Sequence, residues 1–256
     1  MYQAYIFDLD GTIYLGDHIL PGAVETLTAL RAAGRRTIFL SNNPTHTRAQ
    51  YARTLSAFGI PTTIDDIVTS SFALVQWLVA NAPAARLFVI GEQPLQQELR
   101  EAGLHFSRDP RQIDYVVASF DRSFDYPKLQ IAFDAIRVGA TLIATNPDRF
   151  CPVPGGGQPD AAAIIAAIEA CTNTRCALVA GKPSPIMVET VAGMLGIPLS
   201  ACIMIGDRLE TDIAMGIAAG MATALVLTGD ATRESLAASG MQPSYVFERI
   251  DQLLGI

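Results

Sequence analysis

Short apolar segments alternate with longer amphipathic segments along almost the whole chain. The short segments are uncharged, which is typical of buried parallel strands. Strands are predicted at 4–7, 36–40, 86–90, 115–119, 141–145, 178–180, 202–206 and 223–227. Helices are predicted at 22–33, 47–58, 71–81, 93–102, 127–138, 160–171, 185–195 and 211–220, with a terminal helix that ends near Leu254. This alternation predicts an α/β protein with a Rossmann-like, doubly wound and mainly parallel sheet.

Four of the predicted strands end in a small cluster of polar residues. The clusters lie at 8–12 (Asp-Leu-Asp-Gly-Thr), 41–43 (Ser-Asn-Asn), 181–183 (Gly-Lys-Pro) and 206–212, which holds two more aspartates. Because the carboxyl ends of parallel strands meet at one edge, where open α/β sheets bind ligands, we expect these groups to converge. Carboxylates, a hydroxyl and an ammonium together supply what phosphoryl transfer needs.

The first cluster places Asp8 and Asp10 one residue apart at the end of a buried strand. Two like charges at a sheet edge repel one another, and a bound cation would remove that cost. Aspartate oxygens are hard ligands that suit Mg²⁺. Taken alone, the same residues also fit a plain strand followed by an Asx turn.

The region between Ser41 and Lys182 has its own strand and helix rhythm. Since Ser41 and Lys182 must share one site, this region is interpreted as an inserted domain. The sequence therefore predicts a catalytic core at 1–81 and 177–256 and an inserted α/β domain at 82–176.

The composition of the chain limits the classes of partner that the protein is expected to bind. The net charge is −7 and the sequence pI is about 4.9, which argues against a nucleic acid or an acidic membrane surface as partner.

Two further features concern the location of the protein in the cell. The four cysteines form no CxxC pair. A core strand begins by Ala4, which leaves no room for a signal peptide. The longest apolar region, 213–229, contains glycines and is interpreted as helix, turn and strand. These observations predict a cytoplasmic protein without a transmembrane segment.

The four clusters resemble, in order, the motifs of the haloacid dehalogenase (HAD) superfamily of aspartyl-phosphate hydrolases. The Ser-Asn-Asn, Gly-Lys-Pro and Gly-Asp-Arg-Leu-x-Thr-Asp sequences look like its NagD-type branch, often called p-nitrophenyl phosphatases. The similarity covers nearly the whole chain, including the insert. It implies that the insert is a large α/β cap over the active site.

The resemblance assigns a role to each motif. Asp8 would attack the phosphorus of a monoester and form an aspartyl-phosphate, and Asp10 would serve as general acid and later as general base. Ser41 and the Asn42 backbone N–H would hold phosphate oxygens. Lys182 would balance the charge of Asp8 and the phosphoryl group.

The same resemblance implies a Mg²⁺ ion. Asp8, the Asp10 backbone carbonyl and Asp207 would bind it, and Asp212 would orient a metal-bound water. For Asp212 the sequence also fits an N-terminal helix carboxylate that interacts with the helix dipole. Arg208 and Asn43 are weaker site candidates.

The cap is expected to contact the substrate through Asn146 and Asp148, although an Asn-Pro-Asp turn explains these residues equally well. The chain departs from the family shortly afterwards, because Pro159 and Asp160 stand where a Pro-Gly pair is usual. Asp160 fits the cap of the next helix, and the change leaves the substrate open. The sequence does not specify the oligomeric state, but members of the family often dimerise through the cap, so the resemblance allows a homodimer through the cap.

The favoured function is a Mg²⁺-dependent phosphomonoesterase that acts on a small phosphorylated metabolite, such as a sugar phosphate or a nucleoside monophosphate. One alternative is a phosphotransferase or mutase of the same superfamily, whose members usually carry a small helical cap just after the first motif. The short stretch between Asp10 and the helix at 22–33 disfavours it. The other alternative, a non-catalytic phosphate-binding protein, conflicts with the complete set of acids and Lys182.

Overall fold

A computed structural model describes residues 2–153 and 156–256 and divides the chain into two compact units. The first unit comprises Met1–Ser41, Arg48–Val68 and Met187–Ile256, and the second comprises Asn42–Thr47 and Thr69–Ile186. The chain enters the second unit at Asn42 and again at Thr69, and it returns to the first unit at Arg48 and at Met187. The assignment of 1–81 and 177–256 to catalysis and of 82–176 to substrate choice remains a prediction, because compactness does not reveal which segment governs which step.

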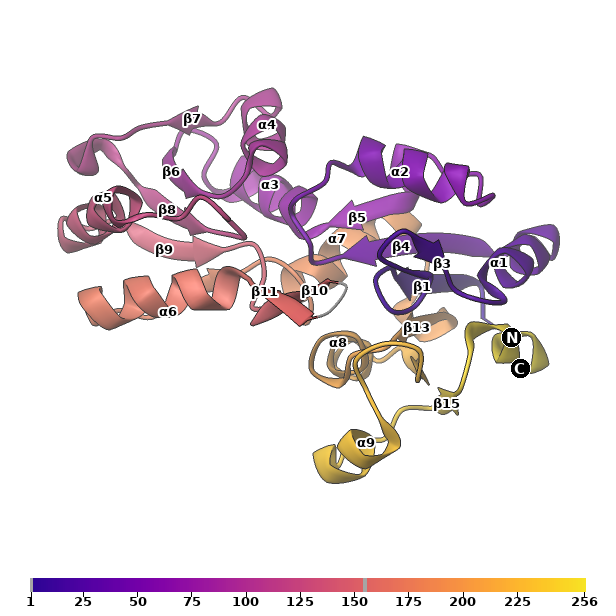
Figure 1. Ribbon diagram of the computed structural model, residues 1–256. Coiled ribbons are helices and arrows are strands. Elements are labelled where there is room, and N and C mark those ends of the chain that lie inside the picture. The colour runs from indigo at the N-terminus through magenta and orange to yellow at the C-terminus, as the bar shows by residue number, and fades with distance from the viewer. Residues whose placement is uncertain (1, 154–155) are drawn as a thin grey trace. The chain divides into compact units, whose positions relative to one another are not determined.

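The first unit is built on a six-stranded sheet with the strand order β15-β14-β13-β1-β4-β5 (Figure 1). The strands are β1 (Ala4–Asp8), β4 (Arg36–Ser41), β5 (Ile67–Thr69), β13 (Cys202–Gly206), β14 (Ala222–Val226) and β15 (Tyr245–Phe247). The central strand β1 runs parallel to both neighbours, with Phe7 opposite Phe39 on one side and Ile205 on the other. Strands from the two ends of the chain are therefore adjacent at the centre of this sheet.

Helices cover this sheet because its side chains alternate between two buried faces. The helices of the unit are α1 (Ala23–Ala32), α2 (Arg48–Ala57), α7 (Pro185–Leu195), α8 (Ala214–Ala218) and α9 (Arg233–Ser239). On one face Phe7, Phe39 and Ile205 form a core with residues of α1 and α2. On the opposite face Ile6 and Met204 are fully buried. The sheet is thus buried on both sides, which explains its continuous apolar strands.

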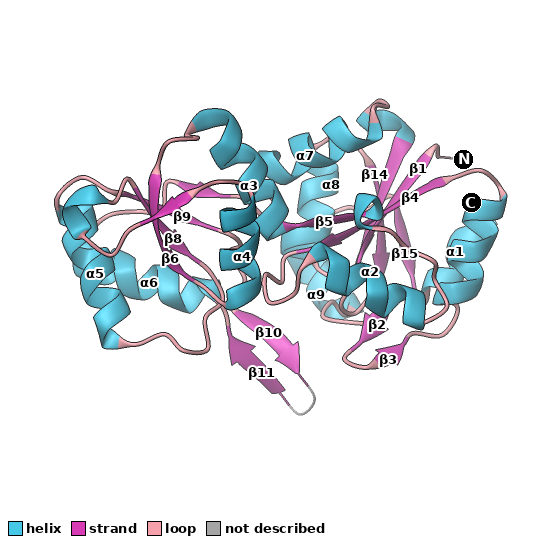
Figure 2. Cartoon of the chain, turned by 90° about the horizontal axis from the view of Figure 1, so that it is seen from above, coloured by secondary structure: helices cyan, strands magenta, loops and turns pink. Residues whose placement is uncertain are grey.

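The second unit holds another parallel sheet, with the order β12-β9-β8-β6-β7. Its strands are β6 (Arg86–Ile90), β7 (His105–Phe106), β8 (Tyr115–Ala118), β9 (Thr141–Ala144) and β12 (Leu178–Val179). Its helices are α3 (Ser70–Asn81), α4 (Gln93–Glu101), α5 (Tyr126–Arg137) and α6 (Ala161–Thr172). One buried cluster joins α5 and α6 to β6, β8 and β9, and Figure 2 shows α3 and α4 on the other side of the strands. The predicted α/β class with parallel sheets is confirmed.

Several elements differ from the sequence-based prediction. The prediction of a single terminal helix was wrong, because the C-terminal region forms α9, β15 and a 3-10 helix at Ile250–Gly255. The helix predicted at 211–220 is a π-helical turn at Leu209–Ile213 followed by α8. Two hairpins carry no strong apolar signal, namely β2 (Tyr14–Leu15) with β3 (His18–Ile19), and β10 (Phe150–Val153) with β11 (Gly156–Pro159).

None of the helices described within 2–153 and 156–256 has both the length and the apolar character needed to cross a bilayer.

Candidate functional site

Asp8 and Asp207 lie side by side at the carboxyl edge of the first sheet. Asp8 ends β1, and Asp207 follows β13, which pairs with β1 in parallel register. The apolar strands that precede the two acids carry them into the protein, so that Asp8 is 8% exposed and Asp207 is 3% exposed. Adjacent parallel strands thus bring together two acids that stand far apart in the sequence, as the motif analysis predicts.

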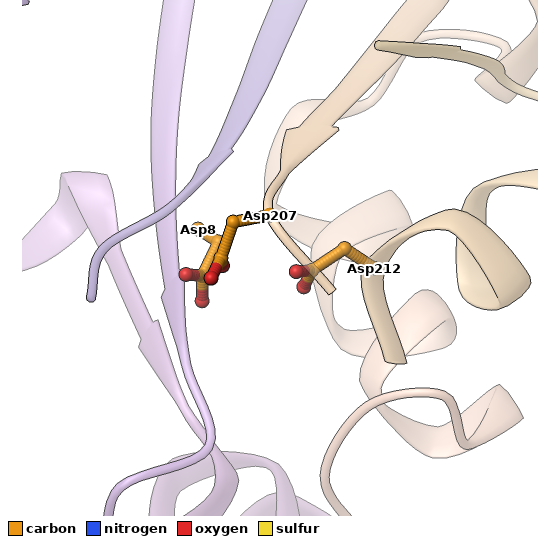
Figure 3. Close-up of side chains that lie close together, drawn as sticks. All are labelled: Asp8, Asp207 and Asp212. Atoms are coloured by element: carbon orange, nitrogen blue, oxygen red, sulfur yellow. The ribbon is translucent and has the colours of Figure 1, made fainter. Parts of the chain in front are cut away.

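Asp212 reaches the same place through the π-helical turn at Leu209–Ile213. Its Oδ2 accepts a hydrogen bond from the Arg208 backbone N–H (3.1 Å). Gly206 leaves room for this approach, because a Cβ there would lie 2.3 Å from the Asp212 Cγ. In Figure 3 the Asp212 carboxylate points toward those of Asp8 and Asp207. A π-turn widens the helix by one residue per turn and is frequent at functional sites.

Asp8, Asp207 and Asp212 form a compact cluster of buried carboxylates. One oxygen of each lies within 4.8 Å of the others. Burial in the first place, and then the charges of Asp8 and Asp212, raise the pKa of Asp207 well above its usual value. Three such groups repel one another when all are ionised, so the cluster is suited to a cation.

The hydrogen bonds of Asp207 also fit a cation. Its Oδ2 accepts the Asp230 backbone N–H (2.7 Å). Its Oδ1 is buried and has no hydrogen-bond partner among the described residues. A buried carboxylate oxygen without a partner is costly, and a metal ion would satisfy it. The donor set consists only of oxygen atoms, which suits a hard divalent cation.

Asp10 lies in a tight turn directly after Asp8. The backbone N–H groups of Thr12, Ile13 and Tyr14 all donate to the Leu9 carbonyl, at 3.2, 2.9 and 3.2 Å. This turn ends the strand abruptly. Asp10 is partly exposed, whereas Asp8 is buried. The two acids of the first motif therefore sit in different environments, which is what different chemical roles require.

Ser41 ends β4 next to β1 in the same sheet. It is buried, and its hydroxyl donates to the Tyr51 hydroxyl of α2 (3.1 Å). The sequence did not identify Tyr51 as a site residue, because its place on the buried face of α2 indicates only that it packs in the core. The contact fixes the orientation of the serine that was predicted to bind phosphate.

The second unit brings together Asn42 and Lys182, which are predicted site residues 140 positions apart. The Asn42 side chain accepts from the Lys182 backbone N–H (2.8 Å) and donates to the Lys182 carbonyl (3.1 Å). Both residues are buried. The sequence suggests only the backbone N–H of Asn42 as functional. The structure adds that its side chain holds the main chain of Lys182 in place.

Asn146 and Asp148 belong to a buried polar network in the second unit. Asn146 is 0% exposed, and its amide group donates to Asp148 Oδ2 (3.1 Å) and Asp160 Oδ1 (3.2 Å). Asp160 also accepts the Ala161 N–H (2.5 Å) at the start of α6, so the predicted helix cap is confirmed. These hydrogen bonds give Asn146 a structural task, and its contact with substrate remains a prediction.

The segment Thr228–Ala231 also contacts the site, although the sequence did not identify it as part of the site. It follows β14, and its Thr-Gly-Asp sequence looks like an ordinary turn. In the structure it contacts both Asp207 and the loop after β1. Only the pairing of β13 with β14 could have indicated that the end of β14 lies near Asp207.

Comparison with known protein families gives two matches, one in each half of the chain. A family described as haloacid dehalogenase-like hydrolase matches residues 5–105, and a HAD-hydrolase-like family matches residues 179–253. Among characterised proteins, the sugar-phosphatase AraL of Bacillus subtilis is 40% identical over 88% of this chain and 83% of its own length. The acid sugar phosphatase of Staphylococcus aureus is 34% identical over 99% of this chain and 97% of its own.

Solved structures agree with these sequence matches. The 4-nitrophenylphosphatase from Thermotoga maritima superposes with a TM-score of 0.95 at 35% identity, covering 100% of this chain and 97% of that protein. A putative nagD protein superposes with a TM-score of 0.91 at 34% identity, covering 100% and 98%. The motifs, the fold and the relatives all lead to one family. The chain belongs to the haloacid dehalogenase-like hydrolases and, within them, to the NagD-like phosphatases.

Proposed function

We propose that this protein is a Mg²⁺-dependent phosphomonoesterase that hydrolyses a small organic phosphate through an aspartyl-phosphate on Asp8. The observation that carries the proposal is the buried cluster of Asp8, Asp207 and Asp212 at the carboxyl edge of the sheet. Its Asp207 Oδ1 has no hydrogen-bond partner among the described residues and is available to a cation. Asp8 is then both a nucleophile and a neighbour of that cation.

Asp8, the Asp10 backbone carbonyl and Asp207 would hold the Mg²⁺ ion, and Asp212 would orient a water bound to it. The bound ion would neutralise the charge of the carboxylates and of the phosphate ester. Carboxylate and carbonyl oxygens are the hard ligands that Mg²⁺ prefers. Ca²⁺ takes about 6–8 ligands at longer distances. We therefore expect Ca²⁺ to engage both oxygens of Asp8 and to inhibit.

The reaction proceeds in two steps that balance in atoms and charge. A carboxylate oxygen of Asp8 forms a bond to phosphorus while the bond from phosphorus to the alkoxide oxygen breaks, and Asp10 gives its proton to that oxygen. Asp10 then takes a proton from a water molecule, whose oxygen attacks the aspartyl-phosphate. Inorganic phosphate leaves, and the Asp8 carboxylate is restored with Asp10 protonated again.

Phosphate oxygens would be held by the Ser41 hydroxyl and the Asn42 backbone N–H. The Ser41 hydroxyl has a single proton and donates it to Tyr51 in this structure, so binding a phosphate oxygen would require that proton to turn toward the phosphate while Tyr51 donates to Ser41. Lys182 would offset the negative charge of the phosphoryl group as a compact cation. Asn42 supports that role by holding the Lys182 main chain through two hydrogen bonds.

Sugar phosphates are the first substrates to test, because two relatives are named sugar phosphatase and acid sugar phosphatase. The residues 82–176 would govern the choice among esters, since the proposed chemical groups lie outside them. A phosphotransferase or mutase remains the rival within the superfamily. It is disfavoured because only the short hairpin β2–β3 separates the first motif from α1.

The decisive experiment is phosphate release from a panel of esters with Mg²⁺, with EDTA and with excess Ca²⁺. The panel contains sugar phosphates, nucleoside monophosphates, phosphoglycolate, pyridoxal phosphate and p-nitrophenyl phosphate. We expect phosphate release only with Mg²⁺, and with water as acceptor. Full activity in EDTA would remove the metal from the proposal. Transfer of the phosphoryl group to an added sugar, in place of release, would establish the phosphotransferase.

A further inference from the structure

The segment Thr228–Ala231 contacts the first unit's site although it carries none of the family motifs. It leaves β14 at the edge where β13 delivers Asp207. The family motifs include Asp207, but among the described residues they contain no group that orients its carboxylate. Three hydrogen bonds from the segment Thr228–Ala231 fix Asp207 and the turn after β1 in place.

Two backbone N–H groups of the segment hold Asp207 at both ends. The Asp230 N–H donates to the carboxylate Oδ2 (2.7 Å), and the Ala231 N–H donates to the backbone carbonyl of Asp207 (3.0 Å). With the main chain and Oδ2 both fixed, the direction of Oδ1 is fixed as well. Oδ1 is the buried oxygen that has no hydrogen-bond partner among the described residues.

The third hydrogen bond ties the segment to the first motif. The Thr228 hydroxyl donates to the backbone carbonyl of Gly11 at 2.6 Å. Gly11 follows Asp10 directly, and the Gly11 N–H donates to the Tyr14 carbonyl (2.8 Å) within the tight turn. One short segment therefore contacts both strand ends that present the acids.

Gly229 makes this close approach sterically feasible. A Cβ at position 229 would lie 2.0 Å from the Asp207 Oδ2, 2.6 Å from its Cγ and 2.9 Å from its Cβ. The whole side chain of Asp207 is thus in the way, and Asp207 is 3% exposed. A methyl group at 229 would force the carboxylate or the segment to move.

We propose that Thr228–Ala231 is a positioning segment that presents Asp207 Oδ1 to the metal ion. The inference rests on the proposed function in so far as that function supplies the metal. Gly229 and Thr228 are positioning residues, because they act through Asp207 and through the turn after β1. Such supporting contacts typically change metal affinity by about 10–100-fold when they are removed.

Gly229→Ala tests the proposal, with Gly193→Ala as the matched control. Gly193 lies in α7 of the same unit, and a Cβ there would meet nothing within 4 Å. Both variants add one methyl group, and both leave every proposed ligand in place. Mg²⁺ affinity is measured by calorimetry on metal-free protein, so that the readout does not depend on turnover. We expect Gly229→Ala to raise the Kd for Mg²⁺ by at least about tenfold and Gly193→Ala to leave it unchanged.

Kinetics separate positioning from a general loss of structure. In Gly229→Ala the Mg²⁺ concentration for half-maximal turnover should rise with the Kd, and excess Mg²⁺ should restore part of the rate. A Kd equal to that of Gly193→Ala would overturn the proposal. If the wild-type protein bound Mg²⁺ but released phosphate from no ester, the proposed function would fail while this inference would still be judged on the Kd.

Thr228→Val provides the second test if Gly229→Ala does not fold. Valine has nearly the shape of threonine but cannot donate to the Gly11 carbonyl. We expect the Kd for Mg²⁺ to rise by up to about tenfold, with a circular dichroism spectrum like that of the wild type. An unchanged Kd in folded Thr228→Val would show that the segment does not position the site through the turn after β1.

Discussion

The two sheets of this protein share a parallel topology, but their carboxyl edges differ in charge. In the first unit, Asp8, Asp207 and Asp212 crowd together, and the described residues provide Asp207 with no ion pair. In the second unit, two of the acids that follow strands have close cationic partners. Glu92 contacts Arg122 at 2.6 Å, and the buried Asp121 contacts Lys128 at 2.7 Å.

The difference in charge indicates that acids at the end of a parallel sheet can have two roles, stabilising the fold or binding a cation. Acids that form ion pairs with side chains need no external cation, and breaking a buried pair costs stability. An edge whose buried acids face one another gains from an external cation. The edge where Asp8, Asp207 and Asp212 crowd together is therefore the one expected to bind metal and phosphate.

Asp8→Asn should abolish turnover and leave the fold intact. Asparagine is nearly isosteric with aspartate but cannot act as the carboxylate nucleophile. Enzymatic rate enhancements reach about 10²¹-fold for phosphate monoesters, so no uncatalysed route will be visible. Steady-state hydrolysis of p-nitrophenyl phosphate measures the loss, and circular dichroism checks the fold.

Asp121→Asn is the matched control from the other edge. It makes the same chemical change at a buried acid that also follows a parallel strand. We expect turnover close to that of the wild type together with a lower melting temperature, because Lys128 loses its partner. If Asp8→Asn kept more than a tenth of the wild-type turnover, Asp8 would not be the nucleophile and the contrast between the edges would fail.

Without metal, the contribution that Asp207 makes to the stability of the protein should fall as pH rises. The pKa of Asp207 is raised well above 3.8 in the folded protein by burial and by the charges of Asp8 and Asp212. A group whose pKa is raised on folding stabilises the protein below its unfolded pKa, and that contribution is lost as pH rises through the folded pKa. Melting curves in EDTA, from pH 4 upward, should show this decline.

Mg²⁺ should remove most of the decline at the high-pH end. A ligand at about 100 times its Kd stabilises the folded state by about 2.7 kcal/mol. Asp207→Asn offers the matched comparison, because it deletes the titrating group and should flatten the metal-free profile. Metal-free pH profiles that coincide for the wild type and Asp207→Asn would show that the three carboxylates do not repel one another as their geometry indicates.

Much of this site could be predicted because its residues stand at strand ends. Asp8, Ser41 and Asp207 each follow an apolar strand, and parallel pairing alone brings those ends together. The fold class followed from the same alternation of strands and helices. Local signals therefore sufficed wherever one residue and its own strand determined the position.

The parts that could not be predicted depend on contacts between distant segments. The π-turn that delivers Asp212 has the apolar spacing of an ordinary helix. The segment Thr228–Ala231 has only the signature of a turn, and its role depends on two neighbouring strands. The C-terminal strand β15 is only three residues long, Tyr245–Phe247, which is too short for a periodic strand pattern to be recognised. In each case tertiary packing decides what the local pattern leaves open.

The smallest effect should come from a neutral amide in the second unit, Asn146. Asn146→Ala removes the donor that Asp148 and Asp160 share, at 3.1 and 3.2 Å, in a place where Asn146 has no exposed surface. Leaving buried polar groups without a partner costs about 1–3 kcal/mol, and we expect a loss of unfolding free energy in that range. Urea unfolding measures it. Gln130→Ala is the control, since Gln130 makes the same amide-to-carboxylate contact with Asp134 (3.0 Å) at the surface, where water can replace it. Asn146→Ala should also change the relative kcat/KM among esters if Asn146 contributes to substrate choice. An equal loss of kcat/KM on every ester, together with the loss of stability, would show that its hydrogen bonds serve only to hold the second unit together.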